Sequence, residues 1–119
     1  MTDDCVFCKI RDGEIPSDIL YRDELCFVIR DIAPLAPTHL LVIPAEHFER
    51  ISELESRFDQ TFGAMFAAAK NSANAEGVSE NGYRLTINQG RDGGQEVPHL
   101  HMHLLGGRRL GGLGVPSER

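Results

Sequence analysis

The chain has 119 residues, of which 41% are hydrophobic and 25% charged, and its formal net charge is −6 with a pI near 5.3. This length suffices for one domain with its own hydrophobic core. The acidic balance argues against a protein that binds nucleic-acid backbones. No stretch approaches the roughly 20 apolar residues that a membrane span needs.

These features predict one domain over residues 1–119, with a short tail at 109–119. The polar start MTDDC is unlike a signal peptide. We therefore expect a cytoplasmic protein that binds neither nucleic acid nor membrane. In that compartment the three cysteines serve as thiols or metal ligands rather than as disulfides.

Short strands and one long helix follow one another along the chain. The stretch CVFCKIRDGEIPS holds a short apolar piece that ends in a turn region, and Pro34 and Pro37 bracket a stiff loop. Short connections between strands favour an antiparallel sheet, so the predicted class is α+β. The predicted strands are a hairpin of 19–21 and 25–29, the apolar run 39–44, the alternating segment 83–88, and the histidine segment 97–107.

The long helix is predicted over residues 52–77. Ser52 and Glu55 form a capping-box pattern at its start, and Gly77 is a plausible stop. Apolar residues at steps of three and four form one stripe, which we interpret as part of the core. The stripe consists of Phe58, Phe62, Met65, Phe66, Ala69 and Ala73.

The segment VPHLHMHLLGG places His99, His101 and His103 at alternate positions. On a strand the three imidazoles would share one face, while the apolar residues between them would face the core. The pattern has three interpretations: a zinc site, a nucleophile with its supporting histidines, or incidental surface histidines. We disfavour the third because protonated rings side by side would repel one another.

Glycines precede the histidines in the loop QGRDGGQE, at positions 90, 93 and 94. Such a loop can surround a phosphate with backbone N–H groups, and a plain turn would use glycines as well. Next to three histidines, the phosphate interpretation is favoured. Asp31 also stands out, because it is a carboxylate directly after an apolar strand.

Cys5 and Cys8 form a C-x-x-C motif, whose spacing suits two thiolates on one tetrahedral zinc. A redox pair and two buried thiols are the alternatives. Cys26 lies in a predicted strand, and we interpret it as a small buried hydrophobic residue.

The run Pro98–Leu105 resembles the His-φ-His-φ-His-φ-φ signature (φ apolar) of the histidine triad, or HIT, family. The segments DIAPLAPTHLLVIPAEHFERISEL and GYRLTINQGRDGGQEVPH and the ending LLGGR are similar to the Hint branch of that family, so the resemblance covers about residues 5–108. It implies an antiparallel sheet of about five strands with one long and one short helix. It also implies a homodimer in which the two sheets join edge to edge and the long helices pack together.

The resemblance implies a nucleotide hydrolase or transferase that cleaves P–N bonds of purine nucleoside phosphoramidates, of the AMP-amine or AMP-lysine type. His101 would attack the α-phosphorus to form a nucleotidyl-histidine, which water then hydrolyses. His103 would contact the phosphate or leaving group, and His99 and His39 would support the network. The alternatives are a dinucleoside polyphosphate hydrolase (the Fhit branch), which the ending LLGGR disfavours, and a non-catalytic nucleotide-binding protein.

The resemblance also assigns the residues that would bind the nucleotide. Asp31 would take the ribose hydroxyls, with Ile32 beside it. Asn88 and the backbone of Gly94, Glu96 and Val97 would contact the phosphate. An apolar purine slot, whose residues would otherwise be interpreted as core, would consist of Val6, Phe7, Ile10, Ile29 and Leu41.

Two positions depart from the Hint pattern. Glu96 stands where animal Hint proteins carry a serine, and we expect its carboxylate to turn away from the phosphate and offer only the backbone N–H. The C-terminal segment LGGLGVPSER has no tryptophan, which the tail of that branch carries.

Bacterial-type relatives pair the C-x-x-C with two histidines on a structural zinc. By position the ligands here would be Cys5, Cys8, His47 and His99. Four protein ligands leave no open coordination position, so this zinc would be structural, and no catalytic metal is expected.

Overall fold

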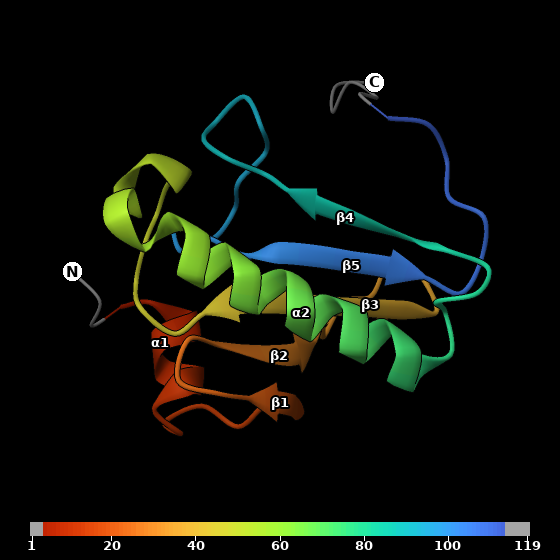
Figure 1. Ribbon diagram of the computed structural model, residues 1–119, viewed down its shortest axis with the longest axis horizontal. Coiled ribbons are helices and arrows are strands. Elements are labelled where there is room, and N and C mark those ends of the chain that lie inside the picture. Colours follow the sequence, from red (N-terminus) through yellow and green to blue (C-terminus); the bar gives the residue numbers. More distant parts are fainter. Residues whose placement is uncertain (1–3, 114–119) are drawn as a thin grey trace.

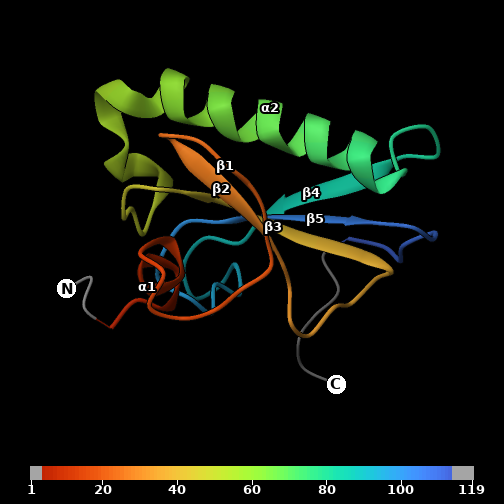
Figure 2. The same ribbon diagram turned by 90° about the horizontal axis from the view of Figure 1, so that it is seen from below.

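The computed structural model describes residues 4–113; residues 1–3 and the last part of the predicted tail, 114–119, lie outside the described range. Five antiparallel strands form one sheet in the order β1-β2-β3-β5-β4, with helix α2 on one face and the short helix α1 on the other (Figures 1 and 2). The predicted α+β class is confirmed. The elements are α1 (Val6–Arg11), β1 (Ile19–Arg22), β2 (Cys26–Arg30), β3 (Thr38–Pro44), the 3₁₀ turns η1 (Ile51–Glu53) and η2 (Glu55–Arg57), α2 (Phe58–Glu76), β4 (Tyr83–Ile87) and β5 (Met102–Gly106).

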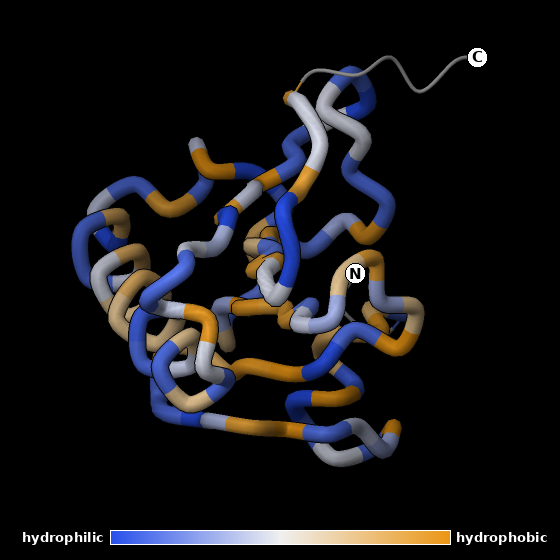
Figure 3. The backbone as a smooth tube through the Cα atoms, turned by 90° about the vertical axis from the view of Figure 1, so that its right-hand side faces the viewer, coloured by the Kyte–Doolittle hydropathy of each residue, from blue (hydrophilic) through white to orange (hydrophobic). Residues whose placement is uncertain are grey.

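Two apolar layers lie on either side of the central strand β3, all seven residues of which are buried. Leu40 and Val42 face the layer under α2, whereas Leu41 and Ile43 face the layer under α1. This alternation is the period-2 pattern of a strand covered on both faces. In Figure 3 much of the hydrophobic colour follows the interior segments of the tube. Among the described residues, no helix is long and apolar enough to cross a membrane.

The long helix begins later than its sequence pattern predicts. The capping box of Ser52 and Glu55 is wrong: these residues lie in the two 3₁₀ turns, and Arg57 precedes α2 with no side-chain cap. The backbone of Glu55 has φ 49°, a left-handed value that a helix cannot contain. The predicted end is confirmed, because Gly77 adopts φ 78° and its N–H bonds back to carbonyls of the last turn.

The predicted apolar stripe of α2 is only partly core. Met65, Ala69 and Ala73 are buried in the layer against the sheet. Phe58 and Phe66, however, are 46% and 49% exposed. The stripe is therefore wider than the face that the sheet covers, and its aromatic part lies at the surface.

The histidine segment is a strand only from Met102 onward, so the prediction of a strand over all of 97–107 is wrong in its first half. Met102 pairs with Val42 on β3 and with Ile87 on β4, and the chain before it bends away from the sheet. The alternation nevertheless holds on the core side. Leu100, Met102 and Leu104 are at most 1% exposed in the α2-side layers.

The ends of β2 and α2 are joined by a bidentate ion pair. The Arg30 guanidinium donates to both Glu76 carboxylate oxygens at 2.8 and 2.7 Å. These hydrogen bonds lower the pKa of Glu76 below its usual value of 4.5. A lowered folded-state pKa means that the unfolded chain binds the proton more readily, so this pair stabilises the fold above the unfolded pKa and loses its effect as the pH falls through the folded one.

We expect Glu76→Gln to reduce the free energy of unfolding at pH 7 by up to about 1 kcal/mol, since Arg30 is partly exposed. The difference from the wild type should shrink as the pH falls through the lowered pKa of Glu76 in the folded state, because the native carboxylate is then itself protonated. Urea unfolding at pH 7 and at low pH measures both effects. Glu80→Gln, which makes the same charge change in the exposed turn after α2, is the control; equal losses in the two variants would contradict the assignment.

Candidate active site and metal centre

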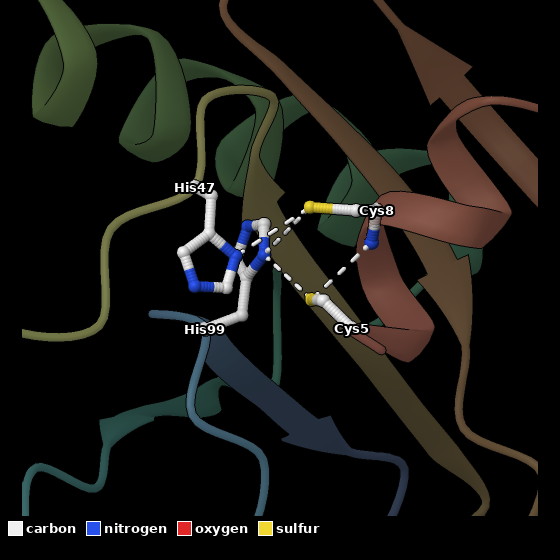
Figure 4. Close-up of side chains that lie close together, drawn as sticks. All are labelled: Cys5, Cys8, His47 and His99. Carbon is white, nitrogen blue, oxygen red and sulfur yellow. Dashed lines mark hydrogen bonds between the residues drawn. The ribbon is translucent and has the colours of Figure 1, made fainter. Parts of the chain in front are cut away.

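One turn of helix and two loops bring four potential metal ligands together at the N-terminal end of α1. Cys5 is the N-cap of α1 and Cys8 lies one turn later, so both thiols point to the same side of the helix. His47 comes from the loop after β3, and His99 from the segment before β5. All four ligand atoms lie within 4.8 Å of one another (Figure 4).

A backbone carbonyl determines how the His99 ring is protonated. His99 Nε2 lies 2.9 Å from the Pro44 carbonyl, which can only accept, so Nε2 carries the hydrogen. The lone pair of Nδ1 then faces Cys5 Sγ at 3.2 Å and Cys8 Sγ at 3.7 Å. Burial lowers the pKa of His99 to about 4. The ring is thus a neutral imidazole aimed at two thiols, the arrangement of a metal-ligating histidine with its outer hydrogen bond.

The thiols themselves favour a cation between them. Burial, together with the hydrogen bond and charge of Cys5, raises the pKa of Cys8 to about 11. Two adjacent thiolates in such a place need a nearby positive charge, which a divalent metal supplies. Within residues 4–113 the cluster consists of two sulfurs and two imidazole nitrogens, a set that matches the preferences of Zn²⁺. The predicted ligand set is therefore brought together, and it could hold a metal ion.

The middle histidine presents a free ring nitrogen. His101 Nδ1 lies 2.7 Å from the His99 carbonyl, so Nδ1 carries the hydrogen and Nε2 keeps its lone pair. Burial lowers the pKa of His101, which is only 6% exposed. The rings of Phe7 and His101 pack in a T-shaped arrangement with a centroid separation of 5.1 Å. His101 is accordingly a neutral imidazole held in one tautomer.

A second chain of hydrogen bonds determines the tautomers of the other two histidines. The Leu35 N–H donates to His39 Nδ1 at 3.0 Å, so the hydrogen of His39 is on Nε2. That N–H faces His103 Nδ1 at 2.9 Å and Asp31 Oδ2 at 3.4 Å. His103 accepts through Nδ1 and therefore carries its own hydrogen on Nε2. Burial lowers its pKa to about 4, which keeps the ring neutral at pH 7.

Side chains of the predicted phosphate loop hold its backbone in place through hydrogen bonds. Asn88 Nδ2 donates to the Gly93 carbonyl at 2.6 Å, and Gly94 adopts φ 81°. Gln95 accepts from the Gly90 N–H and donates to the Glu49 and Val97 carbonyls. The sequence pattern assigns no role to Gln95, and nothing in its immediate neighbours signals one.

The predicted ribose residue Asp31 lies beside the histidines and uses Oδ1 to accept the Ala33 N–H at 2.8 Å. Ile32, next to it, is 97% exposed. Of the predicted purine slot, Val6 is at the surface, and the others are buried in the layer between α1 and the sheet. These buried residues are Phe7, Ile10, Ile29 and Leu41, and Val97 packs half-buried against them.

Glu96 is exposed and lines a hollow of about 360 Å³ together with Cys5, Val6 and His47. The charges of Asp31 and Glu96 both raise the pKa of His101, against the larger opposing effect of burial. The carboxylate thus lies within electrostatic reach of the middle histidine. The expectation that it offers only its backbone N–H to a phosphate stays a prediction.

Comparisons with known proteins agree with this architecture. Residues 12–110 match the HIT domain family. The chain is 49% identical over 111 residues, 93% of each protein, to a purine nucleoside phosphoramidase of Escherichia coli strain K12. It superposes with a TM-score of 0.89 on a HIT family hydrolase from Clostridium thermocellum, at 45% identity over 94% of this chain and 97% of that one. A HIT family hydrolase from Legionella pneumophila gives 0.85, at 47% identity over 89% and 95%.

The family match spans most of the chain, the identities are high over nearly the full length of each relative, and the histidines lie where the motif predicts them. This chain belongs to the HIT family.

Proposed function

We propose that this protein hydrolyses the P–N bond of purine nucleoside phosphoramidates through a covalent nucleotidyl-histidine on His101. The observation that carries the proposal is the His101 Nδ1–H bond to the His99 carbonyl, which leaves Nε2 unprotonated and free to attack. The 49% identity to a purine nucleoside phosphoramidase supports the substrate class.

In the proposed reaction, His101 Nε2 forms a bond to the α-phosphorus as the bond from phosphorus to the amine nitrogen breaks. The leaving amine takes up one proton from solvent. Water then displaces His101, returns one proton to solvent and releases the nucleoside monophosphate. His103 keeps its Nε2–H free because its Nδ1 accepts from His39. That N–H can donate to a phosphoryl oxygen or to the leaving group, where charge changes most.

The rest of the nucleotide would bind around these rings. Asp31 would accept the ribose hydroxyls through its remaining oxygen, beside Ile32. Asn88 and the backbone of Gly94, Glu96 and Val97 would surround the phosphate. The base would insert between Val6 and the apolar layer of Phe7, Ile10, Ile29 and Leu41.

A direct assay separates this proposal from its two rivals. The protein is incubated with an adenosine 5′-phosphoramidate bearing an amine leaving group, and with a diadenosine polyphosphate. Release of AMP mainly from the phosphoramidate supports the proposal. Faster cleavage of the polyphosphate would instead indicate a dinucleoside polyphosphate hydrolase, and binding without turnover of either compound would indicate a nucleotide-binding protein.

His101→Ala should reduce turnover of the phosphoramidate by at least about 10³-fold, because it removes the attacking atom. Nucleotide binding should persist, since the proposed contacts to ribose, base and phosphate come from other residues. Steady-state kinetics and calorimetric titration with AMP measure the two properties, and mass spectrometry of quenched wild-type protein should detect the AMP adduct. His103→Ala should be milder. Retention of more than a few per cent of wild-type turnover by His101→Ala would contradict the assignment.

We also propose that Cys5, Cys8, His47 and His99 bind one structural zinc ion. The short separations between the four ligand atoms and the unprotonated Nδ1 of His99 support it. When bound, the ion would join α1 to the loop after β3 and to the histidine segment, and it would supply no reacting group. A centre that needs reduced cysteines suits the cytoplasm, where we place the protein.

Protein purified without chelator should contain about one zinc per chain by elemental analysis. Cys5→Ser combined with Cys8→Ser should lose the metal and lower the melting temperature by roughly 10 °C, since structural zinc contributes folding free energy directly. Cys26→Ala is the control: Cys26 is buried in another layer and should not affect the zinc content. Metal-free wild-type protein, or a Cys26→Ala variant that loses metal equally, would contradict the proposal.

Finally, we propose that the partner is a second copy of this chain, bound along β4 and α2. β4 lies at the edge of the sheet, and among the described residues it pairs only with β5 (Figure 1). On α2, Phe58, Phe62 and Phe66 form an aromatic row with centroid separations of 4.8 and 6.4 Å, and Phe62 packs in the same apolar cluster as Ile87 of β4. An unpaired edge next to exposed aromatic rings is a surface that association would cover.

Phe66→Glu should convert the dimer to a monomer, because it places a charge in the proposed interface without touching the monomer core. Light scattering coupled to size exclusion at micromolar concentration should give twice 13.2 kDa for the wild type. Leu20→Glu, an equivalent change on β1 at the opposite edge, should leave the dimer intact. A wild-type mass near that of one chain would contradict the proposal. A charge at Met65 or Ala69, on the same helix, would instead disrupt the monomer core.

A further inference from the structure

The loop between β2 and β3 carries two groups that the histidines depend on, yet it has little core of its own. Asp31 begins it, and the Leu35 N–H holds His39. Between residues 32 and 37 only Ala36 is buried, whereas Ile32 and Leu35 are 97% and 70% exposed. A loop with so few buried side chains needs backbone hydrogen bonds to stay in one position.

The chain leaving β5 supplies such a bond from 73 positions away. The Arg108 guanidinium donates through Nη2 to the Leu35 carbonyl at 2.8 Å. Gly107 allows this approach: its backbone has φ 95°, and a Cβ there would lie 2.8 Å from the Pro37 Cβ. Gly107 and Arg108 therefore contact the loop directly, one by close packing and the other by a charge-assisted hydrogen bond.

We infer that Arg108 is a positioning residue for the histidine network. It holds the carbonyl of Leu35, and the backbone N–H of the same residue, on the other side of its Cα, selects the His39 tautomer. His39 in turn donates to His103. The relay ends at the His103 Nε2–H, the group that our proposed function aims at the phosphate or leaving group; the catalytic consequence therefore rests on that function. The effect of Arg108 on the tautomers of the histidine rings does not depend on that function.

The neighbouring arginine provides a matched comparison. Arg109 is exposed like Arg108 and carries the same charge on the same segment. Arg108, in contrast, bridges to a loop far away in sequence. If only positive charge at this end of the molecule mattered, the two residues would be equivalent.

The test compares Arg108→Met, Arg108→Lys and Arg109→Met in the full chain. Two-dimensional ¹⁵N NMR of the histidine rings in the free protein reports the tautomers and needs no substrate. In the wild type, His39 should show an unprotonated Nδ1 and a protonated Nε2. Arg108→Met should move both His39 ¹⁵N shifts toward tautomer-averaged values, and Arg108→Lys, which keeps a donor, should restore them in part.

Kinetics with the phosphoramidate then measure the consequence. Arg108→Met should lower kcat about 10-fold with little change in KM, since misplacing a group at the reacting centre affects the transition state more than nucleotide binding. Arg108→Lys should recover part of the loss, and Arg109→Met should behave as the wild type in both measurements. Gly107→Ala, which pushes on Pro37 and keeps both arginines, should disturb the His39 resonances in the same way.

Native His39 shifts in folded Arg108→Met, or equal effects in Arg109→Met, would overturn the inference. If Arg108→Met fails to fold, Gly107→Ala and Arg108→Lys still decide the question through the same resonances. If the wild type has no phosphoramidase activity, the proposed function fails, while the NMR comparison still tests whether Arg108 determines the His39 tautomer.

Discussion

The hydrogen bond from His99 Nε2 to the Pro44 carbonyl orients one residue for two tasks. It turns the unprotonated Nδ1 of the ring toward the thiols of α1. The carbonyl of the same residue accepts from His101 and so determines which nitrogen of that ring is free. The candidate metal centre and the candidate nucleophile therefore share one residue. A change in the position of the His99 ring would also move the His99 carbonyl and so disturb its hydrogen bond with His101.

Desolvation is the second common factor. Burial is the leading reason that the pKa values of His99, His101 and His103 are lowered. The three rings therefore remain neutral together near pH 7, which removes the repulsion that three protonated imidazoles would suffer. Neutral rings have one donor and one acceptor each, and this is what allows carbonyls and N–H groups of the backbone to select the tautomers.

The sequence predicts well the features that depend on repeated side-chain patterns. Three features follow from such patterns: the alternation of Leu100, Met102 and Leu104, the helix end at Gly77, and the grouping of Cys5 with Cys8. The start of α2 was not, because Glu55 adopts a left-handed backbone that no local pattern signals. The Pro44 carbonyl and the Leu35 N–H were also invisible, since backbone groups are the same at every position and act only where the fold places them.

Strand β3 carries His39 near its start and Pro44 at its end, and all of its residues are buried between two paired neighbours. His39, which donates to His103, and Pro44, whose carbonyl holds His99, are thus roughly five strand steps apart, or about 16 Å along the strand. A central strand of this kind opens only when the whole domain unfolds, whereas the exposed loop that follows β2 can open by itself. Amide hydrogen exchange would distinguish the strand from the loop. The spacing between His39 and Pro44 persists as long as the fold does, whereas the hydrogen bond from the Leu35 N–H to His39 can break and re-form many times in the folded protein.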